Sequence, residues 1–130
     1  MSDTKSPHLS HIAPVFRVTD LAAAHAYYRD RLRFETQFEW KDSDAEPVRY
    51  AILGRDGIVV HLTASPEKHA SVAYGFVADV AAYYEEVKAA GANITEAITD
   101  QPWDMREFET KDPDGNVLIF GEHLSRMEGD

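Results

Sequence analysis

The stretch Val18-Thr19-Asp20-Leu21-Ala22-Ala23 returns 59 residues later as Val77-Ala78-Asp79-Val80-Ala81-Ala82. In both copies an apolar run ends near an aspartate, whose side-chain oxygen can accept a free backbone N–H at the start of a helix. Further along, Asp56-Gly57 returns as Asp114-Gly115 and Val59 as Val117, both 58 residues later. These matches predict an internal duplication. The alternative is chance similarity between two amphipathic helices, which does not account for the matching turns.

Each half of the duplication has the pattern of one strand, one helix and three further strands. In the first half we expect strands at 11–18, 34–40, 49–53 and 58–63, with a charged loop at 41–47. In the second half we expect strands at 72–78, 93–99, 106–111 and 117–122. The two helices begin after Asp20 and Asp79. The sequence thus predicts two units with the same order of elements.

Apolar residues at helical spacing predict which helix faces are buried. The two predicted stripes are Leu21, Ala24, Tyr28 and Leu32 in the first helix, and Val80, Tyr83, Tyr84 and Val87 in the second. Gly91 stands where a C-terminal cap belongs. In the segment 34–40, alternation predicts that Phe34, Phe38 and Trp40 lie on one side.

Length, composition and charge exclude several classes of protein. The chain has 130 residues, of which 44% are apolar, and no cysteine. We therefore expect a single domain over 1–130, with modules at 11–63 and 72–122 and flexible tails at 1–10 and 123–130. The absence of cysteine excludes disulfides and Cys-ligated zinc and fits the cytoplasm, as does a polar start without an apolar signal region. No apolar run approaches the ~18 residues of a membrane helix.

The formal net charge of −10 at pH 7 favours some partners over others. Negative potential repels phosphate backbones, so we do not expect nucleic-acid binding. A cationic ligand would instead be attracted.

Three segments carry a resemblance to a known group of proteins. They are Pro14 to Asp20 (PVFRVTD) with Tyr27-Tyr28-Arg29-Asp30, Asp56 to Leu62 (DGIVVHL), and Asp112 to Asn116 (DPDGN). With them the chain resembles the vicinal oxygen chelate superfamily, which includes glyoxalase I, extradiol dioxygenases and bleomycin resistance proteins. Gln101-Pro102-Trp103 and Arg106-Glu107-Phe108 look closest to the bleomycin resistance branch. The resemblance implies an α+β fold in which two βαβββ modules form a cup-shaped cleft of mixed sheets.

The resemblance also implies where the metal enzymes of the superfamily hold their ion. Carried over one at a time, the four ligand positions are Ala13, His61, Val72 and Ile119. Alanine, valine and isoleucine have no lone pair, and one imidazole does not make a stable divalent site. We therefore expect no metal and no cofactor. The alternative is a metal-dependent lyase, isomerase or dioxygenase with an atypical site that includes His61.

Six residues are candidates for ligand binding. They are His61, Trp103, Trp40, Tyr50, Phe38 and Glu107. Aromatic faces stack on planar or cationic molecules, an imidazole can donate or accept a hydrogen bond, and a carboxylate can pair with a basic group. The alternatives are packing for the aromatic residues, a core role for His61, and plain solvation for Glu107 and its neighbour Glu109.

The leading hypothesis is a metal-independent protein that sequesters a small molecule, as the bleomycin resistance proteins do in antibiotic resistance. Its ligand would be cationic or aromatic and bleomycin-like. The resemblance further implies a homodimer with two clefts between its subunits. Besides the enzyme alternative, the domain could have become a partner-binding or regulatory module without a small ligand.

Overall fold

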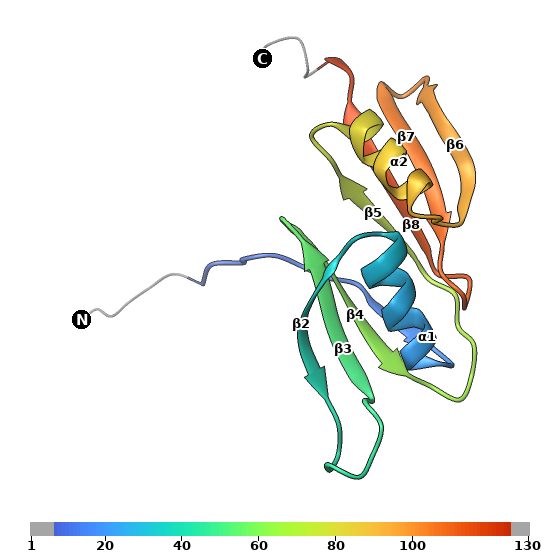
Figure 1. Cartoon of the computed structure of the whole chain (residues 1–130). Coiled ribbons are helices and arrows are strands. Elements are labelled where there is room, and N and C mark those ends of the chain that lie inside the picture. The colour runs from blue at the N-terminus through green and yellow to red at the C-terminus, as the bar shows by residue number, and fades with distance from the viewer. Residues whose placement is uncertain (1–6, 126–130) are drawn as a thin grey trace.

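The computed structural model describes residues 7–125, which form two four-stranded mixed sheets, each accompanied by helix (Figure 1). Module one contains β1 (Val15–Val18), α1 (Leu21–Ala26), the π-helical turn η1 (Tyr27–Arg31), β2 (Glu35–Trp40), β3 (Tyr50–Arg55) and β4 (Ile58–Ala64). Module two contains β5 (Val72–Phe76), α2 (Val80–Ala89), β6 (Ile94–Gln101), β7 (Met105–Lys111) and β8 (Val117–His123). The fold class is α+β, as the sequence predicted.

The duplication is visible in the topology of the two sheets. The strand orders are β1-β4-β3-β2 and β5-β8-β7-β6, so each strand of module one has its counterpart at the same place in module two. In both sheets the first strand pairs in parallel with the last, and the other pairs are antiparallel. The two halves therefore share one architecture.

The predicted helix signals have the expected roles. Asp20 accepts a hydrogen bond from the Ala23 N–H, and Asp79 accepts one from the Ala82 N–H, both at 3.1 Å. All residues of both predicted apolar stripes are buried. Gly91 has a φ of 88°, the left-handed conformation that glycine adopts without a Cβ penalty at a helix end.

The first strand is shorter than the sequence predicted. β1 begins at Val15, and its ladder with β4 ends where the His61 N–H donates to the Pro14 carbonyl. Residues 7–14 have no regular structure, and Leu9 and Ile12 are almost fully exposed. The alternation of residues at 11–18 does not show where the strand begins, because β4 pairs with Val15–Val18 alone. The chain also stays ordered into the predicted C-terminal tail, since β8 ends at His123; residues 1–6 and 126–130 lie outside the described residues.

The prediction that Phe34 shares a side with Phe38 and Trp40 is wrong. The pairing of β2 with β3 shifts register between Thr36 and Phe38, which is the mark of a β-bulge. Because an extra residue reverses the alternation of side chains, Phe34 is buried in the core whereas Phe38 and Trp40 are exposed on the other face. The pattern of apolar and polar residues in this segment does not predict the bulge.

Polar side chains of the turn 112–116 connect the two modules. The Tyr28 hydroxyl donates to Asp112 at 2.9 Å, and the backbone N–H and hydroxyl of Thr19 donate to Asp114. The side-chain amide of Asn116 donates to the Arg17 carbonyl at 3.0 Å. The three acceptor and donor residues of this turn are buried, and one hydrophobic cluster contains residues of both modules. No helix within residues 7–125 is long and apolar enough to cross a membrane.

Candidate functional site

Each sheet has one face packed against the core and one open face. In Figure 1, α1 and α2 lie along their own sheets and leave the other side of each sheet uncovered. We call the open side of module one face one and that of module two face two. Large apolar side chains are exposed on the strands of both faces and in the turn beside face two: Val15, Phe38, Trp40, Val72, Tyr74, Phe76 and Trp103. On β1 and β5 the residues that alternate with them are buried or half-buried, as in Phe16 and Gly75, whereas Glu39 between Phe38 and Trp40 is exposed.

Face one brings together four of the six candidate residues. The Tyr50 hydroxyl and the His61 Nδ1 share a hydrogen bond of 2.6 Å, and the two rings meet edge to face. In the strand register, Phe38 and His61 both flank Ile52, while Trp40 is paired with Tyr50. His61 and Tyr50 are half-buried, whereas both Phe38 and Trp40 are about half exposed. Face one thus presents an imidazole–phenol pair next to open aromatic surface.

Face two brings together the other two candidates around one carboxylate. The Tyr74 hydroxyl donates to Oε2 of Glu107 at 2.5 Å, and the Trp103 indole N–H donates to the same oxygen at 3.4 Å. Burial, with Glu107 as hydrogen-bond acceptor, raises the pKa of Tyr74, so the phenol remains the donor. Glu107 and Glu109 share this face, because Phe108 and Thr110 between and after them are buried.

Three further aromatic residues of face two, Tyr74, Phe76 and His123, were not among the candidates predicted from the sequence. The rings of Tyr74 and Phe76 have centroids 5.1 Å apart, and Phe76 stacks on His123 at 6.4 Å. Nδ1 of His123 has no hydrogen-bond partner in the described structure and lies 4.0 Å from Asp104. The alternation of Val72, Tyr74 and Phe76 on a predicted strand could have indicated that Tyr74 and Phe76 share one face. No local sequence pattern indicated that His123 belongs to it.

The six candidates do not share a cavity within one chain. A cavity of about 850 Å³ lies between the two modules, where the β3–β4 turn approaches β5 and α2. None of the six candidates lines it, although Tyr74 and Phe76 do. The fold instead presents the candidates as two separate groups on two open faces.

Of the four positions that the resemblance implied for metal ligands, His61, Val72 and Ile119 lie on strands, whereas Ala13 lies before β1. Ala13 immediately precedes Pro14, whose carbonyl accepts from His61, and Ile119 is paired with Tyr74 on face two. Within residues 7–125, no three His, Asp or Glu side chains gather in a way that would hold a metal ion. The donor chemistry at these four positions is therefore that of one imidazole.

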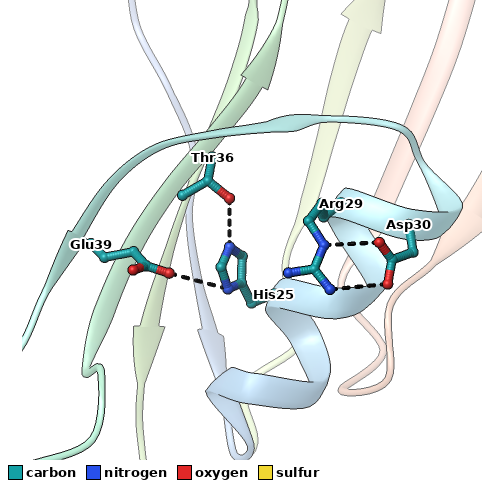
Figure 2. A network of polar contacts seen from close by, with 5 residues as sticks. All are labelled: His25, Arg29, Asp30, Thr36 and Glu39. Atoms are coloured by element: carbon teal, nitrogen blue, oxygen red, sulfur yellow. Dashed lines mark hydrogen bonds and ion pairs between the residues drawn. The ribbon is translucent and has the colours of Figure 1, made fainter.

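A further polar network involves His25 and lies on the helix side of module one (Figure 2). Nε2 of His25 is 2.7 Å from the Thr36 hydroxyl, and its Nδ1 is 3.5 Å from Glu39. The bulge in β2 puts Thr36 and Glu39 on the same side, toward α1. In the same view, Arg29 pairs with its neighbour Asp30. The contacts of His25 thus connect α1 to the edge strand β2.

Comparisons with known proteins agree with this geometry. The family model described as "Glyoxalase/Bleomycin resistance protein/Dioxygenase superfamily" matches residues 8–120. A comparison with curated proteins gave no significant match.

Several solved structures share the fold. TioX from Micromonospora sp. ML1 is 23% identical, with a TM-score of 0.76 over 88% of this chain and 99% of that chain. A glyoxalase-related enzyme from Clostridium phytofermentans is 20% identical, with a TM-score of 0.75 over 92% and 99%. The bleomycin-binding protein of Streptomyces verticillus, complexed with copper(II)-bleomycin, is 23% identical, with a TM-score of 0.71 over 88% and 97%.

The family model spans most of the chain, and the paired βαβββ modules are the architecture that the resemblance implied. The chain belongs to the glyoxalase/bleomycin resistance protein/dioxygenase superfamily.

Proposed function

We propose that this protein binds a small aromatic or cationic molecule and holds it without transforming it. The observation that carries the proposal is the pair of open faces, each with exposed aromatic rings beside a hydrogen-bonded polar pair. Soluble domains rarely expose clustered aromatic residues unless something covers them. Stacking on rings and pairing with a carboxylate are the two kinds of contact that such faces offer.

The donor chemistry at the four metal positions supports binding without metal-dependent turnover. Ala13, Val72 and Ile119 cannot ligate an ion, and His61 is engaged with Tyr50. Names of similar structures point the same way, because one of them is a bleomycin-binding protein in complex with its ligand and another is a bleomycin resistance determinant encoded on transposon Tn5. A bleomycin-like ligand, and with it a role in antibiotic resistance in the cytoplasm, is therefore part of the proposal.

We further propose a homodimer in which face one of one copy meets face two of the other. The sheet edges support this arrangement. β2 carries a bulge and two glutamates, and β6 carries two register shifts and acidic residues, which are features that discourage edge pairing. β1 and β5 have regular ladders without a bulge and without acidic residues; β1 is four residues long and carries Arg17. Pairing of β1 with β5 of a second copy, repeated by two-fold symmetry, would cover both of these edges.

The test combines metal analysis of the purified protein with a thermal-shift screen. The screen contains cationic glycopeptides, planar aromatic natural products, and anionic catechols and thiol adducts. We expect no stoichiometric divalent metal, and hits among the cationic or planar compounds. A ligand at 100 times its Kd adds about 2.7 kcal/mol of apparent stability.

Trp103→Ala is the control for the site, because Trp103 is exposed and its loss leaves the core intact. Hits that bind through face two should weaken in this variant. A metal present at about one ion per chain, together with turnover of the anionic compounds, would contradict the proposal and favour the enzyme alternative that centres on His61.

A further inference from the structure

The carboxylate of Glu107 is held in an unusual way. Both of its intramolecular donors, the Tyr74 hydroxyl and the Trp103 indole N–H, reach the same oxygen, Oε2. Oε1 has no hydrogen-bond partner, and no ion pair involves Glu107, within the described part of the chain. Two neutral donors on one oxygen fix the orientation of the group, while the other oxygen remains free.

Gly121 makes this arrangement sterically possible. A Cβ atom built on Gly121 would clash with the Tyr74 hydroxyl oxygen and lie 2.7 Å from the ring carbon that bears it. Glycine at this place on β8 therefore lets the Tyr74 side chain lie across the sheet and reach Glu107 on the next strand, since Glu107 is paired with Gly121. Any other residue would displace the phenol.

Aromatic surface surrounds the fixed carboxylate. The Tyr74 ring adjoins Phe76, which is 67% exposed, and Trp103, which is 60% exposed, reaches Glu107 from the turn between β6 and β7. A carboxylate oxygen next to open ring faces matches a cationic nitrogen that carries alkyl groups, because the rings attract the alkylated cation and the carboxylate supplies the opposite charge.

We propose that Tyr74, Phe76, Trp103 and Glu107 form a binding site for an alkylated ammonium group, and that Gly121 positions Tyr74 within it. The inference rests on the proposed function and narrows it, because the ligand must then carry an amine that binds to face two. Glu109 on the same face is not part of the site, since its Oε2 accepts from the Thr95 hydroxyl at 2.8 Å.

The experiment compares two probes of the same shape, 3-hydroxyphenyltrimethylammonium and its uncharged carbon analogue 3-tert-butylphenol. Binding of each is measured by NMR titration on the full chain. We expect the cation to bind about tenfold more tightly than the neutral probe. Glu107→Gln should abolish this preference, whereas the matched control Glu109→Gln should keep it.

A double-mutant cycle tests the role of Gly121. Gly121→Ala should lower the preference for the cation in the wild-type background and have no further effect in a Tyr74→Ala background. Tyr74→Phe keeps the ring and removes the hydrogen-bond donor, so it should lower the preference for the cation partly. This variant gives an independent measurement if Glu107→Gln lowers the Tm.

Equal affinity for both probes in the wild type, or a preference that survives Glu107→Gln, would overturn the ammonium site. If planar compounds from the thermal-shift screen still bind in that case, the proposed function stands without it. If neither probe binds and the screen gives no hit, the proposed function fails as well.

Discussion

At the scale of the residue, the motif that carries much of the family resemblance is structural. Asp112 accepts hydrogen bonds from the Tyr28 hydroxyl and from the backbone N–H groups of Asp114 and Asn116. These groups are buried, so each lost partner would leave a polar atom without water to replace it. The turn 112–116 therefore serves the contact between modules, and the chemistry of the open faces depends on other residues.

Buried tyrosines at this contact predict sensitivity to alkali. Burial and the nearby Asp112 charge raise the pKa of Tyr28 far above its ordinary value of 10.0, and burial raises the pKa of Tyr27 to about 12. A raised pKa in the folded state means that stability is complete below about pH 10 and falls as the pH rises toward the folded-state pKa. For each such tyrosine the slope is about 1.4 kcal/mol per pH unit.

Urea unfolding at several values between about pH 9 and about pH 11.5 measures this slope. In Tyr28→Phe the free energy of unfolding should decline less steeply, by about 1.4 kcal/mol per pH unit, although the variant is less stable at neutral pH because Asp112 loses a donor. Identical slopes in the wild type and the variant would show that Tyr28 ionises as easily in the folded chain as in the unfolded one.

At the scale of the element, strand edges and a single bulge decide what each face presents. The bulge in β2 places Phe38 and Trp40 on face one, beside Tyr50 and His61. The edges without a bulge are β1 and β5, and the side chains of Val72 and Phe76 are exposed along β5. These features connect local strand geometry to the proposed pairing of two copies.

A charge placed on the β5 edge should therefore prevent that pairing. Val72 is 66% exposed, so Val72→Lys costs the isolated chain little, but in the proposed dimer the ammonium group would lie in the seam between strands. We expect sedimentation equilibrium at micromolar concentration to show a dimer for the wild type and a monomer of 14.6 kDa for Val72→Lys.

The matched control is Ala97→Lys, which adds the same charge to the exposed residue Ala97 on the protected edge strand β6. This variant should remain dimeric. A wild-type chain that is monomeric, or loss of the dimer in both variants, would argue against the β1–β5 seam.

At the scale of the whole molecule, the formal charge of −10 acts on every ligand that approaches. Diffuse negative potential raises the local concentration of cations, and added salt screens it. Ring contact with an indole does not depend on net charge. The two contributions to the affinity for a cationic ligand can therefore be separated.

For a cationic hit from the thermal-shift screen, we expect the Kd to rise with salt concentration. The loss of affinity in Trp103→Ala, about 0.5–2 kcal/mol, should be nearly the same at low and high salt, whereas the loss in Glu107→Gln should be larger at low salt. Titration calorimetry at two salt concentrations gives both numbers. If Trp103→Ala leaves every hit unchanged, Trp103 has only a structural role.

The sequence by itself determined the duplication, the helix starts at Asp20 and Asp79, both buried stripes and the fold class. These features follow from local rules: a cap bonds within one turn, and a stripe repeats with the helix period. Residue type, position in the repeat and the family resemblance identified His61, Trp103 and Glu107 as candidates. Their role in ligand binding stays a prediction.

Only the tertiary structure decided which residues meet. The shift in β2 moved Phe34 into the core, and the ladder with β4 ended β1 at Val15, because pairing depends on the partner strand and not on the segment's own alternation. The contact of Tyr74 with Glu107 joins residues 33 positions apart and requires a glycine on a third strand. Such a contact cannot be predicted from the residues next to Tyr74 or Glu107 in the sequence, because the groups that stabilise it are brought together by folding alone.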